Sequence, residues 1–332
     1  MWWARRCTST AARASHSTAG NYPGHSKLWH YQVLMPRSRL SPARIAARFL
    51  VMLASLVLAG LLAFHQLVPD VLGLGLVLDN LAPWLGLAIP FLALLTLGAG
   101  GRGPWTVLLV PILVWAVSFG PQAVPAARPT ANLSVATMNS HGDPQLLDAD
   151  VVALQELAEG QANAMTAQFR ATHPYHYTLS TVGVWSKYRL VHAESLNLGL
   201  KWARALRTDV ETESGTVRLY TVHAASARPL QHAERDQMLR NLAGYVEKDS
   251  SQRIVVAGDF NATSSDRHFA PVARQLDEAK NEGWGLAMTW PRRPFGMLGI
   301  DHVMTRGVDK ATVQKLEAGD SDHFALRASI KF

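Results

Sequence analysis

The segment IVVAGDFNAT, from Ile254 to Thr263, places polar side chains at the end of a predicted buried strand. Its four apolar residues lead directly into Gly258, Asp259, Phe260 and Asn261, so a carboxylate and an amide are delivered together. Burying an unpaired charge is costly. Asp259 therefore either caps a turn or faces a site that contains a cation or a protonated base.

Polar residues also mark the ends of other predicted strands. They are Asn139 after LSVATM, Gln155 and Glu156 after DVVAL, His223 after LYTV, Asp301 and His302 after GMLGI, and Asp322 and His323 before the last strand. Singly, each has a structural explanation: Asn139 caps a turn, Glu156 pairs with an arginine, and His223 is a satisfied core histidine. Six such ends in one domain are much harder to explain as capping.

The strands that must position these residues alternate with helical stretches from Leu133 onward. Apolar strand patterns cover 133–139, 148–157, 217–226, 253–263 and 323–332, and helical patterns cover 158–173 and 229–249. The mixture predicts a layered domain of sheets and helices, without an internal repeat.

In this order, Asn139 and the motifs ALQE, TVHA, GDFN, IDHV and SDHF resemble the endonuclease/exonuclease/phosphatase superfamily. The resemblance covers about Leu133 to Phe332, and GDFN followed by SDH carries most of it. It implies an α/β four-layered sandwich, in which two mixed β-sheets pack face to face with helices outside. The implied activity is phosphoester hydrolysis.

Phosphoryl transfer needs a hard cation, a positioned water and a proton donor for the leaving group. The resemblance implies that Asn139 and Glu156 hold the metal, with Asp322 as a further ligand. Carboxylate and amide oxygens suit Mg²⁺, and Mn²⁺ is an alternative.

The resemblance implies catalytic roles for five other residues. Asp259 would orient or deprotonate the attacking water, and Asn261 would donate to a phosphate oxygen. His223 would support the leaving oxygen. His323 would act as general base or as a phosphate-contacting imidazole, and Asp301 would hydrogen-bond it and raise its pKa.

Two features depart from the superfamily pattern. Asn139 and Glu156 lie close together in the chain, which predicts a trimmed first helix and a site that is open on one side. The segment SKYRL has arginine where the superfamily has proline, so Lys187 and Tyr188 are weaker candidates for substrate contact. Arg292 is a further substrate-binding candidate.

The N-terminal part predicts a membrane anchor. A basic, disordered cytoplasmic tail is expected over 1–48, three transmembrane helices within 49–120, and a proline-rich linker over 121–132, followed by the catalytic domain over 133–332. A start at Met35 is an alternative to Met1. Cys7, the single cysteine, excludes an intramolecular disulfide and a cysteine-based zinc site.

Charge predicts the orientation in the membrane. Basic residues precede the first span and Arg102 lies in the second connector, whereas the first connector carries Asp70 and Asp79. The positive-inside rule then places the N-terminus in the cytoplasm and the catalytic domain outside it, at the plasma membrane. His65 is expected to be an interfacial residue, and Asp79 and Asn80 to lie in the first connector.

The formal charge of +7 is uneven along the chain. Residues 1–128 carry +8, from ten Lys and Arg against two acids, and the remainder carries −1, from 22 against 23. A domain that grips nucleic acid usually carries a basic face. Only a local patch around Arg292 and Arg293 could act in this way, with Trp284, Trp290 and Phe295 nearby to rest on a membrane.

Three spans followed by such a domain resemble the membrane proteins linked to teicoplanin resistance (VanJ-type). This resemblance implies a metal-dependent hydrolase of undecaprenyl pyrophosphate at the outer leaflet, with the lipid bilayer as its partner. The alternatives are an extracellular, membrane-tethered endonuclease and a phosphodiesterase of phospholipid headgroups. A binding module without activity is disfavoured because every expected catalytic position is filled.

Overall fold

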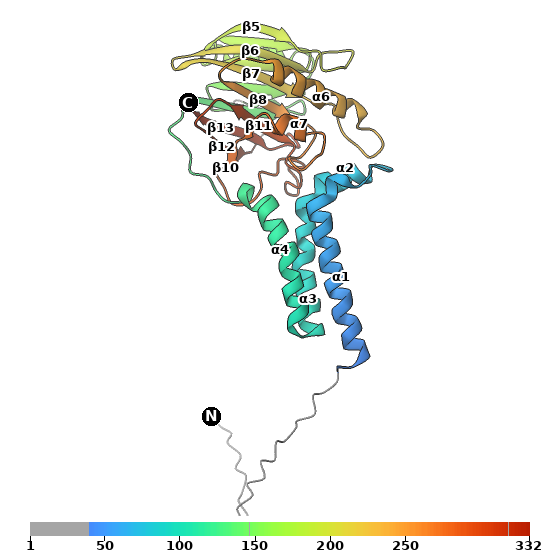
Figure 1. The fold of residues 1–332 in the computed structure, drawn as a ribbon. Helices are drawn as coiled ribbons and strands as arrows, with labels where there is room; N and C mark the ends of the chain where they lie inside the picture. The colour runs from blue at the N-terminus through green and yellow to red at the C-terminus, as the bar shows by residue number, and fades with distance from the viewer. Residues whose placement is uncertain (1–39, 146, 318) are drawn as a thin grey trace, which may run out of the picture. The chain divides into compact units, whose positions relative to one another are not determined.

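The computed structural model describes residues 40–145, 147–317 and 319–332 (Figure 1). The predicted start at Met35 and most of the predicted basic tail lie outside the described residues. Ser41–Phe332 form one compact unit.

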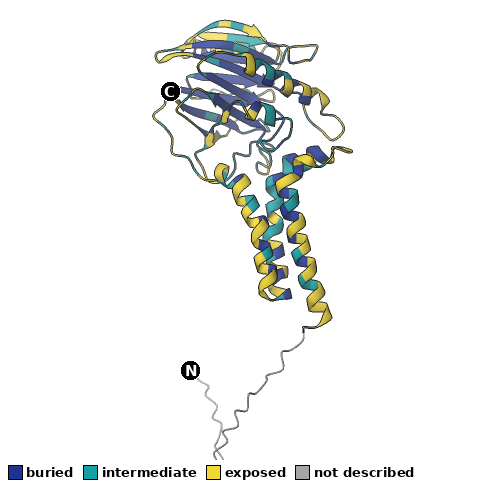
Figure 2. Ribbon diagram, in the orientation of Figure 1, coloured by how far each residue is buried: buried dark blue, intermediate teal, exposed yellow. Residues whose placement is uncertain are grey.

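Three helical segments in this unit are long and apolar enough to cross a membrane: 42–67, 74–99 and 102–123. They contain the helices α1 (Pro42–Phe64), α2 (Leu74–Leu81), α3 (Ala88–Ala99) and α4 (Arg102–Ala123), with short 3-10 helices η1 (His65–Leu67) and η2 (Ala82–Leu87). Their outward faces are apolar and exposed (Figure 2), as expected for surfaces that meet lipid. The chain therefore has the predicted number of candidate spans.

The second span begins earlier than expected, because α2 includes Asp79 and Asn80, which we placed in a connector. Both residues form hydrogen bonds with the C-terminal domain, residues 133–332. Asp79 Oδ2 accepts from Arg267 Nε at 2.5 Å, and Asn80 Nδ2 donates to Asp266 Oδ2 at 2.9 Å. His65 is correspondingly buried, with Nδ1 2.9 Å from Asp79 Oδ1.

Replacing Asp79 with alanine is expected to lower the free energy of unfolding by about 3 kcal/mol, because it removes one partner of a buried ion pair. Arg267 would keep only its bonds to the carbonyls of Val68 and His65. Thermal unfolding in detergent measures this as a fall of several degrees in Tm. Asp148→Ala, at a side chain that is 93% exposed, is the control. Equal Tm values for the two variants would contradict a stabilising role for Asp79.

The C-terminal domain contains a seven-stranded sheet with the order β10-β12-β13-β1-β2-β4-β3. Its strands are β1 (Leu133–Asn139), β2 (Val151–Gln155), β3 (Tyr175–Leu179), β4 (Val182–Ser186), β10 (Lys280–Asn281), β12 (Lys310–Leu316) and β13 (Ala325–Lys331). β1 runs parallel to β2 and antiparallel to β13, so this sheet is mixed.

The second sheet has six strands in the order β5-β6-β7-β8-β11-β9. They are β5 (Arg189–Ser195), β6 (Ala205–Thr212), β7 (Gly215–His223), β8 (Ile254–Asp259), β9 (Asp277–Glu278) and β11 (Asp301–Arg306). β7 and β8 are parallel, and β8 and β11 are antiparallel. The predicted fold of two mixed sheets flanked by helices is confirmed.

Three apolar clusters hold the layers together. One lies between the sheets and joins Val135 and Val151 to Val217 and Val255. The other two pack α5 (Gln161–Phe169) on the first sheet and α6 (Ala233–Lys248) on the second, where the short α7 (Ala270–Ala273) also lies. The central strands are therefore buried on both faces, and polar side chains leave the core mainly at strand ends.

Two predicted helices are shorter in the structure. α5 begins after Gly160, whose φ of 77° lies in the left-handed region, and ends at Phe169. α6 begins at Ala233 because Arg228 and Gln231 pair in a turn across the predicted start. The described residues between β1 and β2 form turns and no helix, in agreement with the short spacing from Asn139 to Glu156.

Candidate active site

Strand register brings the polar ends of the second sheet together. His223, the last residue of β7, pairs with Asp259, the last residue of β8, and Asp259 pairs with Asp301, the first residue of β11. In the facing sheet, Asn139 at the end of β1 is opposite Gln155 at the end of β2. The two sheets meet here, because Asn139 Nδ2 donates to Asp259 Oδ2 at 3.0 Å.

Asp259 is almost fully buried, and its carboxylate accepts several hydrogen bonds. Its Oδ1 accepts from the backbone N–H of Asn261 at 2.8 Å, and its Oδ2 also accepts from Asn261 Nδ2 at 3.2 Å. Burial, followed by the negative charge of Asp301, raises the pKa of Asp259. A carboxylate with a raised pKa is a better proton acceptor once ionised, which suits the predicted role in activating water.

Glycine is required before Asp259. Gly258 has a φ of 146°, and a Cβ at this position would lie 1.9 Å from the carbonyl oxygen of Val222 in the neighbouring strand. Asn261 follows with a φ of 48°. This backbone path turns both polar side chains toward the same place, and it is the local reason for the sequence GDFN.

Asn261 is placed differently from the expected phosphate donor. Its Nδ2 donates to Ala224 O at 3.1 Å as well as to Asp259. Since both amide hydrogens are engaged within the protein, the side chain orients Asp259. A contact with phosphate would require one of these bonds to be exchanged.

His323 and Asp301 form a buried ion pair, with Nδ1 2.8 Å from Asp301 Oδ2. Burial alone would lower the pKa of His323, but the charge and hydrogen bond of Asp301 outweigh it and raise this pKa to about 10. The imidazole is therefore protonated at neutral pH. Of the two predicted roles, this favours a cationic phosphate contact over a general base.

Glu156 follows β2 and faces two imidazoles. Its Oε1 is 3.3 Å from His223 Nε2, and its Oε2 is 3.4 Å from His141 Nδ1. The hydrogen bond with His223 is the main cause that lowers the pKa of Glu156, to about 2. The carboxylate is thus ionised and available to a cation at any ordinary pH.

Asp322 approaches the same place from the loop before β13. Trp290 Nε1 donates to its Oδ2 at 2.9 Å, while its Oδ1 has no hydrogen-bond partner among the described residues. This Oδ1 is 3.7 Å from His141 Nδ1, so the carboxylates of Glu156 and Asp322 flank one point. An ionised carboxylate and an unpartnered carboxylate oxygen fit a hard cation such as Mg²⁺.

A different trio also has the spacing of metal ligands. One ligand atom from each of Asp259, Asp301 and His323 lies within 4.8 Å of the others. His323 already binds Asp301 in a protonated state, so a cation here would have to displace its proton. Glu156, which is ionised and has no such proton to displace, fits a cation better than this trio does.

The predicted substrate contacts Lys187 and Tyr188 lie outside the cavity that Glu156 and Asp259 line. Lys187 Nζ binds Asp150 Oδ1 at 3.1 Å, before the start of β2, whereas the site lies beyond its end. Tyr188 packs against the apolar cluster between the sheets. Both follow β4, which runs antiparallel to β2 and so carries them away from Glu156.

Arg292 is also not free to bind substrate. Its backbone N–H donates to Asp322 O at 2.6 Å, and its Nε donates to Ser321 O at 2.8 Å. Its Nη1 pairs with Glu317 at 2.9 Å. The side chain fixes the loop that bears Asp322, which is a positioning role. Ser321 shares it, since its Oγ donates to Asn139 O at 2.7 Å.

Sequence reasoning missed three residues of the site: His141, Trp290 as a partner of Asp322, and Arg204. Arg204 Nη2 lies 2.8 Å from His223 Nδ1 and 2.5 Å from its Nε2. The sequence signal for Arg204 was weak, because it precedes β6 without a motif. His141 stood in HGDP, which reads equally as a turn.

The catalytic groups open into a cavity of about 500 Å³. Asn139, Glu156, Asp259, Asn261, Asp322 and His323 line it. Its wall also includes residues of α2, from the membrane-anchor part of the chain. The site is therefore built from the sheet ends and from a helix that precedes the domain.

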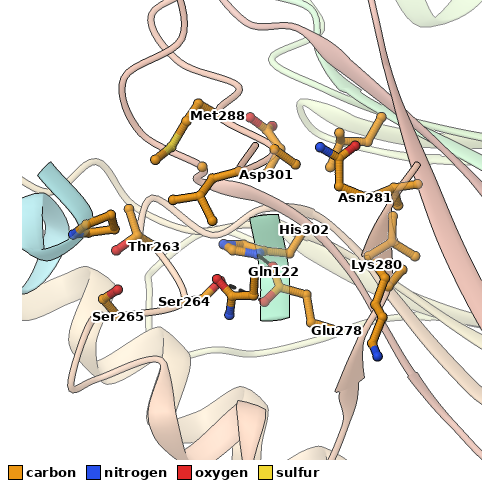
Figure 3. Close-up of a pocket in the computed structure, with 18 of the residues that line it drawn as sticks. Gln122, Thr263, Ser264, Ser265, Glu278, Lys280, Asn281, Met288, Asp301 and His302 are labelled. Atoms are coloured by element: carbon orange, nitrogen blue, oxygen red, sulfur yellow. Dashed lines mark hydrogen bonds and ion pairs between the residues drawn. The ribbon is translucent and has the colours of Figure 1, made fainter. Parts of the chain in front are cut away.

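A second cavity, of about 230 Å³, is lined by Asp301 and His302 of β11 and by Glu278 of β9 (Figure 3). His302 points into it and binds Glu278, with Nδ1 2.8 Å from Oε1, while Gln122 from the end of α4 lies nearby. His302 Nε2 is 2.8 Å from Ala262 O. These bonds satisfy His302, so the residue is structural and is not part of the catalytic group.

The two-sheet sandwich and the residues at its strand ends define an enzyme fold of the phosphodiesterase and nuclease class. The chain belongs to the Endonuclease/Exonuclease/phosphatase family, whose model matches residues 120–323. Comparison with curated proteins gave no match.

Similar solved structures cover the C-terminal domain. SmcL is 10% identical over 60% of this chain and 99% of its own, with a TM-score of 0.50. Sphingomyelinase C from Streptomyces griseocarneus is 16% identical over 59% and 98%, with a TM-score of 0.48. A beta toxin variant from Staphylococcus aureus with bound magnesium ions is 14% identical over 61% and 100%, with a TM-score of 0.48. At these identities the likeness concerns the fold.

Proposed function

We propose that the protein is a membrane-anchored, metal-dependent hydrolase of a lipid-linked pyrophosphate, such as undecaprenyl pyrophosphate, related in function to the teicoplanin-resistance proteins. The observation that carries the proposal is the position of α2. This helix lines the catalytic cavity and also begins the second candidate span. A phosphate group attached to a lipid would meet the catalytic residues directly beside its membrane.

The distribution of arginines supports an active site outside the cytoplasm. Arg44 and Arg48 lie in the first turns of α1, and Arg102 begins α4. Arg48 Nε donates to Ala99 O at 3.2 Å, so these basic residues share one end of the helices. The catalytic domain follows the opposite end of α4. By the positive-inside rule it faces outward from the plasma membrane.

Glu156 and Asp322, with the Oδ1 of Asn139, are the residues that would hold Mg²⁺ or Mn²⁺. The ion, when bound, would neutralise charge on the phosphate oxygens. His141 now lies between the two carboxylates, and its side chain is 63% exposed, so it has room to turn away.

The remaining steps belong to the chain's own side chains. Asp259, held by Asn139 and Asn261, accepts the proton of the attacking water at a carboxylate oxygen. Protonated His323 presents its Nε2 proton to a phosphate oxygen while Asp301 keeps its Nδ1 proton in place. His223, between Arg204 and Glu156, supports the leaving oxygen.

Phosphate release by detergent-solubilised protein in Mg²⁺ tests the proposal, with undecaprenyl pyrophosphate and plasmid DNA offered side by side. We expect release from the lipid, loss in EDTA, and recovery with excess Mg²⁺. Nicking of DNA without lipid turnover would make the protein a tethered endonuclease. Release from a phospholipid headgroup alone would make it a phosphodiesterase. Lipid binding that survives EDTA without any turnover would make it a binding module.

A further inference from the structure

An apolar wall borders the catalytic cavity. Leu76, Val77 and Leu81 of α2 line it on one side, and Leu298 and Ile300, which precede β11, also line it. The chemistry of phosphate hydrolysis needs polar groups, and none of these five side chains can supply one. Apolar surface that borders water is unfavourable unless something apolar covers it.

The apolar wall is fixed to the loop that follows β8 and bears Asn261. Asn80 Oδ1 accepts from the backbone N–H of Thr263 at 2.9 Å, and Asn80 Nδ2 binds Asp266. Arg235 Nη1 donates both to Asp266 Oδ2 and to Asn261 O, each at 2.8 Å. A continuous set of bonds therefore joins α2 to Asn261, so the apolar wall keeps its position relative to the reacting groups.

Exposed apolar residues also lie beside the first turn of α2. Leu72, which precedes α2, and Leu74, its first residue, are 77% and 50% exposed, and Leu230 is 69% exposed. A Cβ on Gly73 would lie 2.7 Å from Pro229, so the loop that bears Leu230 lies against this end of α2. The same helix leads in the other direction into the second candidate span.

We propose that Leu76, Val77 and Leu81 form a binding subsite for the substrate's hydrocarbon chain beyond its first five carbons. This rests on the proposed function and adds where the lipid part is held. The chain is the occupant that fits, because it is covalently attached to the phosphate and must lie beside it. A nucleic acid fits poorly, since Arg228 is the one Lys or Arg among the described residues that line the cavity.

The preference of the enzyme for a long over a short hydrocarbon chain tests whether the subsite binds that chain. Farnesyl pyrophosphate and isopentenyl pyrophosphate share the reacting group and differ in hydrocarbon length. Burial contributes about 0.8 kcal/mol per methylene, so two buried methylenes give a preference of about tenfold. In the full-length protein, we expect kcat/KM to be at least about tenfold higher for the farnesyl compound.

Val77→Asn is the test variant, because Val77 is 39% exposed and a polar side chain there is tolerated by the helix. We expect it to reduce the farnesyl-to-isopentenyl ratio of kcat/KM by about fivefold or more. Val71→Asn makes the same change at a residue that is 63% exposed and does not line the cavity, and should leave the ratio within about twofold. If Val77→Asn fails to fold, Val77→Ala should lower the ratio by a smaller factor.

Three outcomes separate this inference from the proposed function. A ratio that falls in the Val77 variants and not in Val71→Asn supports the subsite. Hydrolysis of both compounds with ratios that are equal in all variants would overturn the subsite and leave the proposed function standing. Failure of the wild-type protein to hydrolyse either compound, with DNA cleavage intact, would overturn both.

Discussion

His323→Ala is expected to lower kcat/KM for the pyrophosphate substrate by about a thousandfold, within the range for removal of a donor that stabilises charge in the transition state. The variant loses the cation that faces the phosphate and leaves Asp301 buried without its partner. Phosphate release measures the loss, and circular dichroism of the solubilised protein checks the fold.

His176→Ala is the matched control for this experiment. His176 is an exposed residue of β3, at the edge of the seven-stranded sheet, and it does not line the catalytic cavity. Its removal should leave kcat/KM within about twofold, as for most surface substitutions. Activity of His323→Ala close to that of His176→Ala would exclude His323 from the reaction.

Asp301→Asn is expected to lower kcat/KM by about a hundredfold at neutral pH and to change its pH dependence. With Asp301 present, His323 keeps its proton until the pH approaches about 10. Without that charge, the lowering of the His323 pKa by burial is opposed only by the weaker effects of Asp259 and Asp322, so the proton is lost at a lower pH. The alkaline limb of the pH profile should therefore move from about 10 toward neutrality.

The raised pKa of His323 also makes the stability of the folded protein depend on pH. Because the pKa of His323 is raised from 6.5 to about 10 on folding, its contribution is complete below about 6.5 and is lost as the pH rises through about 10. Asp301→Asn should remove this contribution most visibly below pH 6.5. Rate profiles and Tm from pH 6 to 10.5 measure both effects, with Asp148→Asn as the exposed control. An alkaline limb that stays at about 10 in Asp301→Asn would contradict the pairing.

Much of the C-terminal domain could be predicted because its signals are local. An apolar run followed by GDFN identifies a buried strand that ends in a polar turn, and Gly258 is explained by the approach of Val222. The residues that begin or end β1, β2, β7, β8 and β11 were all found from this pattern, and register then brings them together. The family match agrees with these motifs.

One physical reason explains why the predicted substrate contacts do not line the catalytic cavity. Lys187 and Arg292 are basic residues near motifs, and a sequence does not say which acid or carbonyl each will bind. Lys187 binds Asp150, and Arg292 binds the loop of Ser321 and Asp322. Pairings of this kind depend on chain direction within a sheet and on contacts between distant loops.

The candidate spans, the sandwich and the residue types at its strand ends follow from sequence patterns, because hydrophobic periodicity and turn chemistry act over a few neighbouring residues. The folded protein adds that α2 forms a wall of the catalytic cavity and that Asp79 and Asn80 hold it there. These contacts join residues more than 180 positions apart. Their formation depends on long-range packing and on buried polar groups finding partners, which no local pattern records.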